Sequence, residues 1–449
     1  MEIFFKYGGC KVTNCTKLLE RVHSAINNIP VIDSHEHLGP DPDGSWPQFD
    51  LCDLIFHNLN SDLTASGMPG IGTHAETPWP QGTRDTAKKW SVVAPYMRNI
   101  ENMVSYQALL RGFKAIYDFP YGNINDDNWA VLNEQIVAAY QREDWIDYVL
   151  REKANIRAAV VDMDTLSTGK DYLFPAMKMD FLMMQGVDPE GIKKLEQRFD
   201  VSLSTFRDLL DLIRSVFRQF KEGGAVAIKS VAAYYRTIDY TDVTEATARG
   251  IFDKGLQNIS KDEKKILQDF VMNEICRLTA ESGLPIQFHT GKLAWNFQFI
   301  ENTNPVHLTV LMKKYPGLRF DIFHGGIPYT GEFGVLANNY PNVYLDINGM
   351  QWTSLEISRR CLSEWLEMVP QNKILWGADS YRVYEGALGQ VLYFREMLSE
   401  VLAEKVNRGL YDFDFAVGLA KKIMYENASD FFSLQGRISG NTTGNTCTK

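Results

Sequence analysis

VIDSHEHL, residues 31–38, places two histidines one residue apart at the end of an apolar run. In an extended strand, side chains at positions i and i+2 point to the same face, so His35 and His37 stand side by side while Glu36 faces the other way. Two imidazoles in this arrangement can chelate a metal ion. An edge strand with two solvated imidazoles would show the same short pattern, so the motif alone does not choose between these interpretations.

Seven further apolar runs with strand character follow along the chain. They cover residues 157–164, 173–180, 225–235, 284–291, 319–326, 342–349 and 373–380. Segments with helical periodicity lie between the last five, which is typical of a parallel sheet with crossover helices. Because eight parallel units of this kind close naturally into a barrel, we expect an α/β fold, a distorted (β/α)8 TIM barrel, as a single domain over residues 1–436.

A long insertion separates the first two expected strands. Residues 41–150 begin rich in glycine and proline and then turn helical and aromatic. Placed after the first strand, the insertion emerges at the C-terminal face of the barrel, where it would form a lid or a pocket wall. A helical decoration or an oligomer contact would explain the same pattern. The polar, glycine-rich end of the chain, residues 437–449, is expected to be disordered.

Composition limits the classes of partner. The chain has 46 basic and 56 acidic residues, a net charge of −10, and no dense basic patch, so nucleic acid is not an expected partner. No apolar run has the length of a membrane span, and the first residues lack the pattern of a signal peptide. We expect a cytoplasmic protein that acts on a small molecule without a membrane or nucleic acid, and a homo-oligomer remains open.

Ligand-type side chains fall at the ends of five of the expected strands. In chain order they are His35, His37, Lys229, His289, His324 and Asp379. In a parallel barrel these strand ends share one rim, where barrel enzymes carry their chemistry. Five separate strands delivering such residues to one mouth are harder to explain by chance than any single motif.

This set of residues suits metal-assisted attack by water. Three or four imidazoles and one carboxylate fit Zn²⁺ or a similar cation with one open position. Such a cation lowers the pKa of bound water to about 7, and Asp379 could take the remaining proton and pass it to a leaving group. Singly, each residue has a structural interpretation: Asp379 could cap a turn, and Lys229 could pair with a carboxylate.

Four of the motifs, in this order, resemble the metal-dependent amidohydrolase superfamily. They are VIDSHEHL, IQFHTG, IFHGG and LWGADS, and the resemblance extends from about residue 28 to residue 435. The stretches AVAIKSVAAYYR and GEFGVLANNYPNVYLDI are similar to the amidohydrolase-2 branch, close to the N-terminal amidohydrolase domain of FluG-like proteins.

The resemblance implies roles for the rim residues. His35 and His37 would bind the metal, and Asp379 would be both a ligand and the proton acceptor. His289 would be either a further ligand or a ligand of a second ion. His324 would bind a second ion or polarise the substrate as a catalytic residue. A Lys229 carboxylated by CO₂ would bridge two metal ions, whereas an unmodified lysine would leave one; zinc is the expected metal in either case.

The expected activity is hydrolysis of a C–N bond, an amide of a small polar molecule, through metal-activated water. The same superfamily contains non-oxidative decarboxylases and sugar-acid isomerases, and both remain alternatives. A non-catalytic regulatory binding protein is an alternative from another class, although the intact set of rim residues argues against it.

Four more polar or aromatic residues are candidates for binding the substrate. Trp295 follows the FHTG loop, Tyr329 follows FHGG, and Arg382 follows Asp379, so each could line the mouth of the pocket. Arg236, a few residues beyond Lys229, could hold a substrate carboxylate through a bidentate contact.

Overall fold

A barrel of parallel strands forms the centre of the computed structural model, which describes residues 12–41, 43–69, 77–79 and 82–438. The eight strands pair in chain order. They are β1 (Val31–Glu36), β2 (Ile156–Met163), β3 (Leu173–Lys178), β4 (Ala227–Ser230), β5 (Ile286–Phe288), β6 (Phe320–Ile322), β7 (Val343–Asp346) and β8 (Ile374–Leu375). The prediction of a (β/α)8 barrel is confirmed.

The chain just after β8 comes back to β1 and brings the two ends of the sheet together. The amide of Ser34 donates to the carbonyl of Trp376 at 3.0 Å, and the amide of Asp379 donates to the carbonyl of His35 at 3.1 Å. Gly377 allows this approach, because a Cβ there would lie 2.7 Å from Asp33 Oδ1 and 2.8 Å from the His35 amide nitrogen. The glycine in LWGADS therefore lets Asp379 stand beside the histidines of β1.

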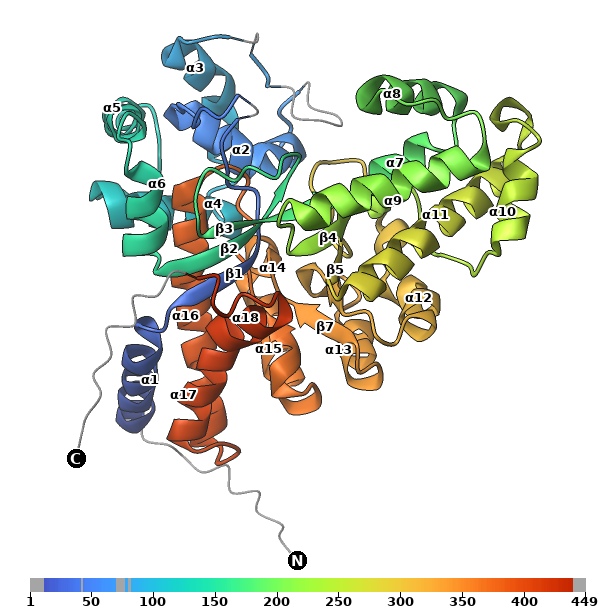
Figure 1. The fold of residues 1–449 in the computed structure, drawn as a ribbon. Helices are drawn as coiled ribbons and strands as arrows, with labels where there is room; N and C mark the ends of the chain where they lie inside the picture. The colour runs from blue at the N-terminus through green and yellow to red at the C-terminus, as the bar shows by residue number, and fades with distance from the viewer. Residues whose placement is uncertain (1–11, 42, 70–76, 80–81, 439–449) are drawn as a thin grey trace, which may run out of the picture.

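Helices surround the barrel (Figure 1). Outside the two long insertions they are α1 (Val12–Asn27), α10 (Glu245–Phe252), α11 (Lys261–Ser282), α12 (Thr309–Lys314), α13 (Thr330–Asn339), α14 (Met350–Thr353), α15 (Leu355–Met368), α16 (Tyr384–Asn407), α17 (Phe413–Lys421) and α18 (Asn427–Phe431). None of the helices in the described part of the chain is long and apolar enough to cross a membrane.

The insertion after β1 is helical. It contains α2 (Leu51–Ala65), α3 (Thr86–Met97), α4 (Val104–Tyr117), α5 (Trp129–Tyr140), α6 (Trp145–Asp147) and a π-helix (Tyr148–Lys153). Asp50 and Asp53 form a capping box that starts α2, and both carboxylates pair with the buried Lys89 of α3, at 2.9 and 2.7 Å. The charge of Lys89 thus ties the first two insertion helices together at the point where α2 begins.

A second helical excursion, for which the sequence pattern had suggested no element, joins β3 to β4. It consists of α7 (Asp180–Gln185), α8 (Pro189–Phe199) and α9 (Phe206–Glu222). The expected strand 173–180 ends at Lys178, because Asp180 already begins α7. Figure 1 shows these helices extending to one side of the barrel, in green. Of the predicted disordered tail, residues 439–449 lie outside the described residues.

Candidate functional site

Two histidines and an aspartate meet where β1 ends and the chain leaves β8. Asp379 Oδ1 lies 3.6 Å from Nε2 of His35 and 3.4 Å from Nε2 of His37. The alternation of β1 puts both imidazoles on the same side of the strand, and Asp379, with a φ of 55°, turns its carboxylate toward them. Burial opposes the ionisation of Asp379, but the hydrogen bond from His37 and the positive charge that His324 carries in the acidic range outweigh it and hold the pKa of Asp379 below the ordinary value.

A second pair of imidazoles stands across from the first. His324 follows β6 with a φ of 58°, and His289 follows β5. Nε2 of His324 lies 3.3 Å from Nδ1 of His289, and Nδ1 of His324 lies 3.7 Å from Asp379 Oδ2. Asp379 therefore stands between both pairs of imidazoles, as the strand-end pattern predicts.

Gly349 leaves room for this arrangement. It has a φ of 65°, and a Cβ at this position would lie 2.6 Å from Asp379 Oδ2 and 3.0 Å from Nδ1 of His324. Because Gly349 has no side chain, it leaves space for Asp379 and His324. The residue pattern gave no reason to expect this role.

Asp162, near the end of β2, is the site residue that sequence reasoning missed. Donor atoms of His35, His37 and Asp162 lie within 4.8 Å of one another. Burial works against its ionisation, but Lys178, whose ammonium lies 2.8 Å from Oδ1, acts together with His37 and Lys229 to lower the pKa of Asp162. The available signal was its place in IRAAVVDMD, because every other ligand-type residue also lies at the end of a strand.

Lys229 points into the barrel beneath these groups. Its Nζ lies 3.3 Å from the centroid of the Phe323 ring and has no hydrogen-bond partner among the described residues. Burial lowers the pKa of Lys229 to about 8, although Asp162 and Asp379 act in the opposite direction. About a tenth of this amine is therefore neutral at pH 7, and the neutral form is the one that reacts with CO₂.

The donor set fits a divalent cation of borderline hardness. Burial lowers the pKa of His35 and His289 well below the usual range and that of His324 to about 4, so all three imidazoles are neutral at pH 7. Nδ1 of His35 is buried without a hydrogen-bond partner in the described chain. Neutral imidazoles and carboxylates are the ligands that Zn²⁺ and similar ions take in open, catalytic sites.

A cavity of about 530 Å³ opens above these residues. The barrel contributes its floor, and the insertion contributes a wall of polar side chains from α2 and α4. That wall comprises His57, Asn58, Asn60, Ser61, Asp62 and Ser105. The loop after β5 is held against α2, because the amide of Trp295 donates to Ser61 Oγ at 3.0 Å and Asn296 Nδ2 donates to the carbonyl of Ser61 at 3.1 Å.

The candidate substrate-binding residues divide into two groups. Trp295 lines the cavity, whereas Arg236, Tyr329 and Arg382 do not. The Arg236 guanidinium donates to Asp269 at 2.7 Å and to the carbonyl of Asp239 at 2.9 Å, and Arg382 pairs with Asp41. The hydroxyl of Tyr329 donates to a backbone carbonyl at 3.2 Å. Each of these three residues has a partner within the protein, and its contact with a substrate stays a prediction.

Known proteins with similar sequences fall into one family. The family model described as Amidohydrolase matches residues 129–434. Protein fluG of Emericella nidulans is 30% identical over 222 residues, which are 46% of this chain but only 26% of that protein's length. The uronate isomerase of Thermotoga neapolitana is 22% identical over 92% of this chain and 96% of its own.

Solved structures show the same architecture. The glucuronate isomerase of Caulobacter crescentus superposes with a TM-score of 0.76 at 17% identity, over 95% of each chain. That likeness concerns the fold. The family match covers more than half of the residues and includes β2 to β8 and Asp379, whereas His35 and His37 on β1 lie outside it. The chain belongs to the amidohydrolase family.

Proposed function

We propose that this protein is a metal-dependent isomerase of sugar acids, which interconverts the aldose and ketose forms of a uronate. The polar wall on α2 and α4 carries this proposal, because amide, hydroxyl and carboxylate groups facing one cavity suit a substrate with several hydroxyls. The alignment with a uronate isomerase over nearly the full length of both chains supports it.

The chain's own residues can move the proton that this reaction requires. Isomerisation moves one proton from the carbon next to the carbonyl to the former carbonyl carbon, and a second proton from the neighbouring hydroxyl oxygen to the former carbonyl oxygen, so atoms are conserved. Asp379 is ionised and is our candidate base. Lys292 lines the cavity and is our candidate for holding the substrate carboxylate. A divalent metal, when bound, supplies polarisation of the substrate carbonyl.

The metal site that we propose consists of His35, His37 and Asp379, with zinc as the metal. His289, His324 and Lys229 would hold a second ion if the lysine is carboxylated. Metal content per chain, measured by plasma mass spectrometry on wild type and on Lys229→Ala, tests this. Two ions that fall to one or none in the variant support a carbamate bridge, and one ion in both proteins contradicts it.

Hydrolysis of an amide remains the second candidate. Lys229 favours it, because its ammonium has no hydrogen-bond partner among the described residues and a strand-end lysine serves no evident purpose in a site that binds a single ion. The match to protein fluG does not decide between isomerase and hydrolase activity, since this chain covers only 26% of that protein.

One experiment separates the two activities. Metal-loaded protein is incubated with a panel of hexuronates in deuterium oxide and with a panel of small amides, and NMR follows the products. Formation of a ketose acid supports the proposal, and deuterium at its new C–H bond would identify a base that exchanges with solvent. Release of amine or ammonia without isomerisation overturns it in favour of a hydrolase.

Asp379→Asn and Glu332→Gln serve as a matched pair in the same assay. Removal of a general base lowers turnover by about 10²- to 10⁴-fold, whereas Glu332 is exposed on α13 and loses the same charge outside the cavity. Equal turnover in the two variants would remove Asp379 from the proton transfer.

A further inference from the structure

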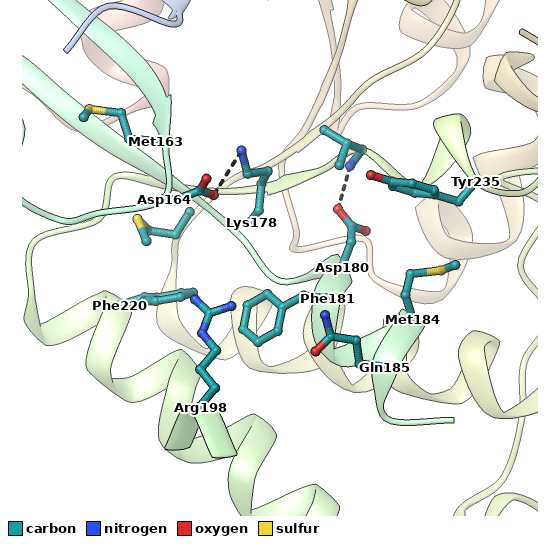
Figure 2. A pocket seen from close by; sticks show the side chains of 12 residues that line it. Met163, Asp164, Lys178, Asp180, Phe181, Met184, Gln185, Arg198, Phe220 and Tyr235 are labelled. Carbon is teal, nitrogen blue, oxygen red and sulfur yellow. Dashed lines mark hydrogen bonds and ion pairs between the residues drawn. The ribbon is translucent and has the colours of Figure 1, made fainter. Parts of the chain in front are cut away.

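A second cavity, of about 380 Å³, adjoins the first. It lies beside the ends of β2 and β3, and the excursion of α7, α8 and α9 forms its outer side (Figure 2). The proton transfer proposed above uses none of its residues. We call it the outer cavity and the one above Asp379 the inner cavity.

The two cavities share part of their lining. Asp164, Lys178, Val231 and Tyr235 border both. The ammonium of Lys178 lies 2.8 Å from Asp162 in the inner site and 3.3 Å from Asp164, and Figure 2 shows Lys178 and Asp164 together at the top of the outer cavity. A single molecule can therefore reach from one cavity into the other past Lys178.

Thioethers and aromatic rings form much of the outer wall. Met163, Met177 and Met184 contribute sulfur, and Phe181 and Phe220 contribute rings. Methionine sulfur interacts favourably with aromatic groups and adapts to their shape, and phenylalanine rings pack against other rings in offset or edge-on geometry. These thioether and ring surfaces suit a flat aromatic group.

Arg198 adds a positive charge to this apolar surface. Its guanidinium stacks over the rings of Phe181 and Phe199, with centroid distances of 4.4 and 5.2 Å, and Figure 2 shows it between Phe181 and Phe220. Among the described residues, Arg198 forms no ion pair with a carboxylate. A stacked guanidinium keeps its N–H edge available, and this edge matches the two oxygens of a carboxylate.

We propose that the outer cavity binds an aromatic group bearing a carboxylate, joined to the polar part that reacts in the inner cavity. The substrate class would then be an aryl-substituted sugar acid, with the aryl group attached away from the reacting carbons. This inference rests on the proposed function. The inner cavity alone is already as large as a pocket for a drug-sized ligand, so a free six-carbon sugar acid would leave the outer cavity without a role.

Binding of two matched probes tests the proposal without turnover. Biphenylcarboxylate and its neutral analogue biphenylcarboxamide are titrated calorimetrically into the full-length, metal-loaded protein. We expect the carboxylate to bind wild type about tenfold more tightly than the amide, the ratio that one charge-assisted contact provides. Arg198→Met, which keeps an unbranched chain against Phe181, should remove this preference, while Lys193→Met removes an exposed charge from the same helix and should retain it.

Two results would overturn the assignment: equal affinity of wild type for both probes, or the same loss of preference in Arg198→Met and Lys193→Met. A third variant, Phe181→Ala, checks the aromatic wall and should weaken both probes alike. Because these titrations involve no turnover, either overturning result refutes only the binding site proposed in the outer cavity and leaves the proposed function untouched. If neither the hexuronates nor an aryl-substituted hexuronate is isomerised while probe binding is intact, the result speaks only against the proposed function.

Discussion

Replacing Gly112 by alanine would show how tightly the insertion is held against the barrel. Gly112 lies in α4 and faces the backbone of α16, where a Cβ would lie 2.0 Å from the carbonyl oxygen of Glu385. The approach is reciprocal, because a Cβ on Gly389 of α16 would lie 2.0 Å from the carbonyl oxygen of Ala108 in α4. Ordinary contact begins at about 3.4 Å, so one methyl group must push the two helices apart.

We expect the loss of unfolding free energy in Gly112→Ala to lie at the upper end of the range for overpacked cores. Extra atoms in a packed core cost about 1 to 3 kcal/mol, occasionally more, and here the obstacle is backbone, which cannot rotate away. We therefore expect Gly112→Ala to lose about 3 kcal/mol of unfolding free energy. In a chain of this length the unfolding entropy is so large that 1 kcal/mol shifts Tm by only about 1 °C, so the expected drop is about 3 °C.

Gly250→Ala is the matched control. Gly250 lies in α10, is exposed, and has nothing within 4 Å of the position of a Cβ. There the same substitution should stabilise the protein by about 0.5 to 1 kcal/mol, because alanine has less backbone entropy to lose than glycine. Urea unfolding followed by far-UV circular dichroism compares the three proteins. Equal midpoints for Gly112→Ala and Gly250→Ala would refute the close packing of α4 on α16.

Three further substitutions have defined outcomes. Arg236→Ala should cost about 2 kcal/mol of unfolding free energy, because the buried Asp269 loses a charged hydrogen-bond donor and keeps Lys265 as its ion-pair partner. KM for the substrate should stay within twofold; a raised KM at unchanged stability would place Arg236 in substrate binding. Burial raises the pKa of Asp180 to about 6, so the folded state gains stability from the protonated form below pH 4 and loses it as the pH rises through 6. Relative to Asp180→Asn, wild type should therefore weaken by up to about 3 kcal/mol between pH 4 and 7, and parallel pH profiles in urea unfolding would contradict this. Gly349→Ala should reduce metal content and lower turnover at least tenfold, because its methyl group would displace Asp379 or His324, whereas Gly331→Ala, with open space around it, should match wild type in both measurements.

Local sequence patterns were sufficient to predict the barrel fold and the residues that meet at its rim. Alternation in VIDSHEHL places His35 and His37 on one side of β1, and the parallel arrangement brings His289, His324 and Asp379 to the same end. These are consequences of a strand period of two residues and of one shared strand direction. Asp162 obeys the same rule and was within reach of the same reasoning.

Only the tertiary structure decided which polar residues face the cavity. Arg236 and Arg382 lie near the site in sequence, yet each pairs with a carboxylate of the protein. Arg198 is far from any motif in the sequence, yet it faces the outer cavity. The helices of the insertion bring Ser61 and Ser105 over the mouth, and no periodicity in residues 41–150 predicts that. The direction of a strand follows from its own residues. The partner of a long charged side chain depends instead on loops and helices that are distant in sequence, because the packing of those loops and helices decides which opposite charge lies nearest.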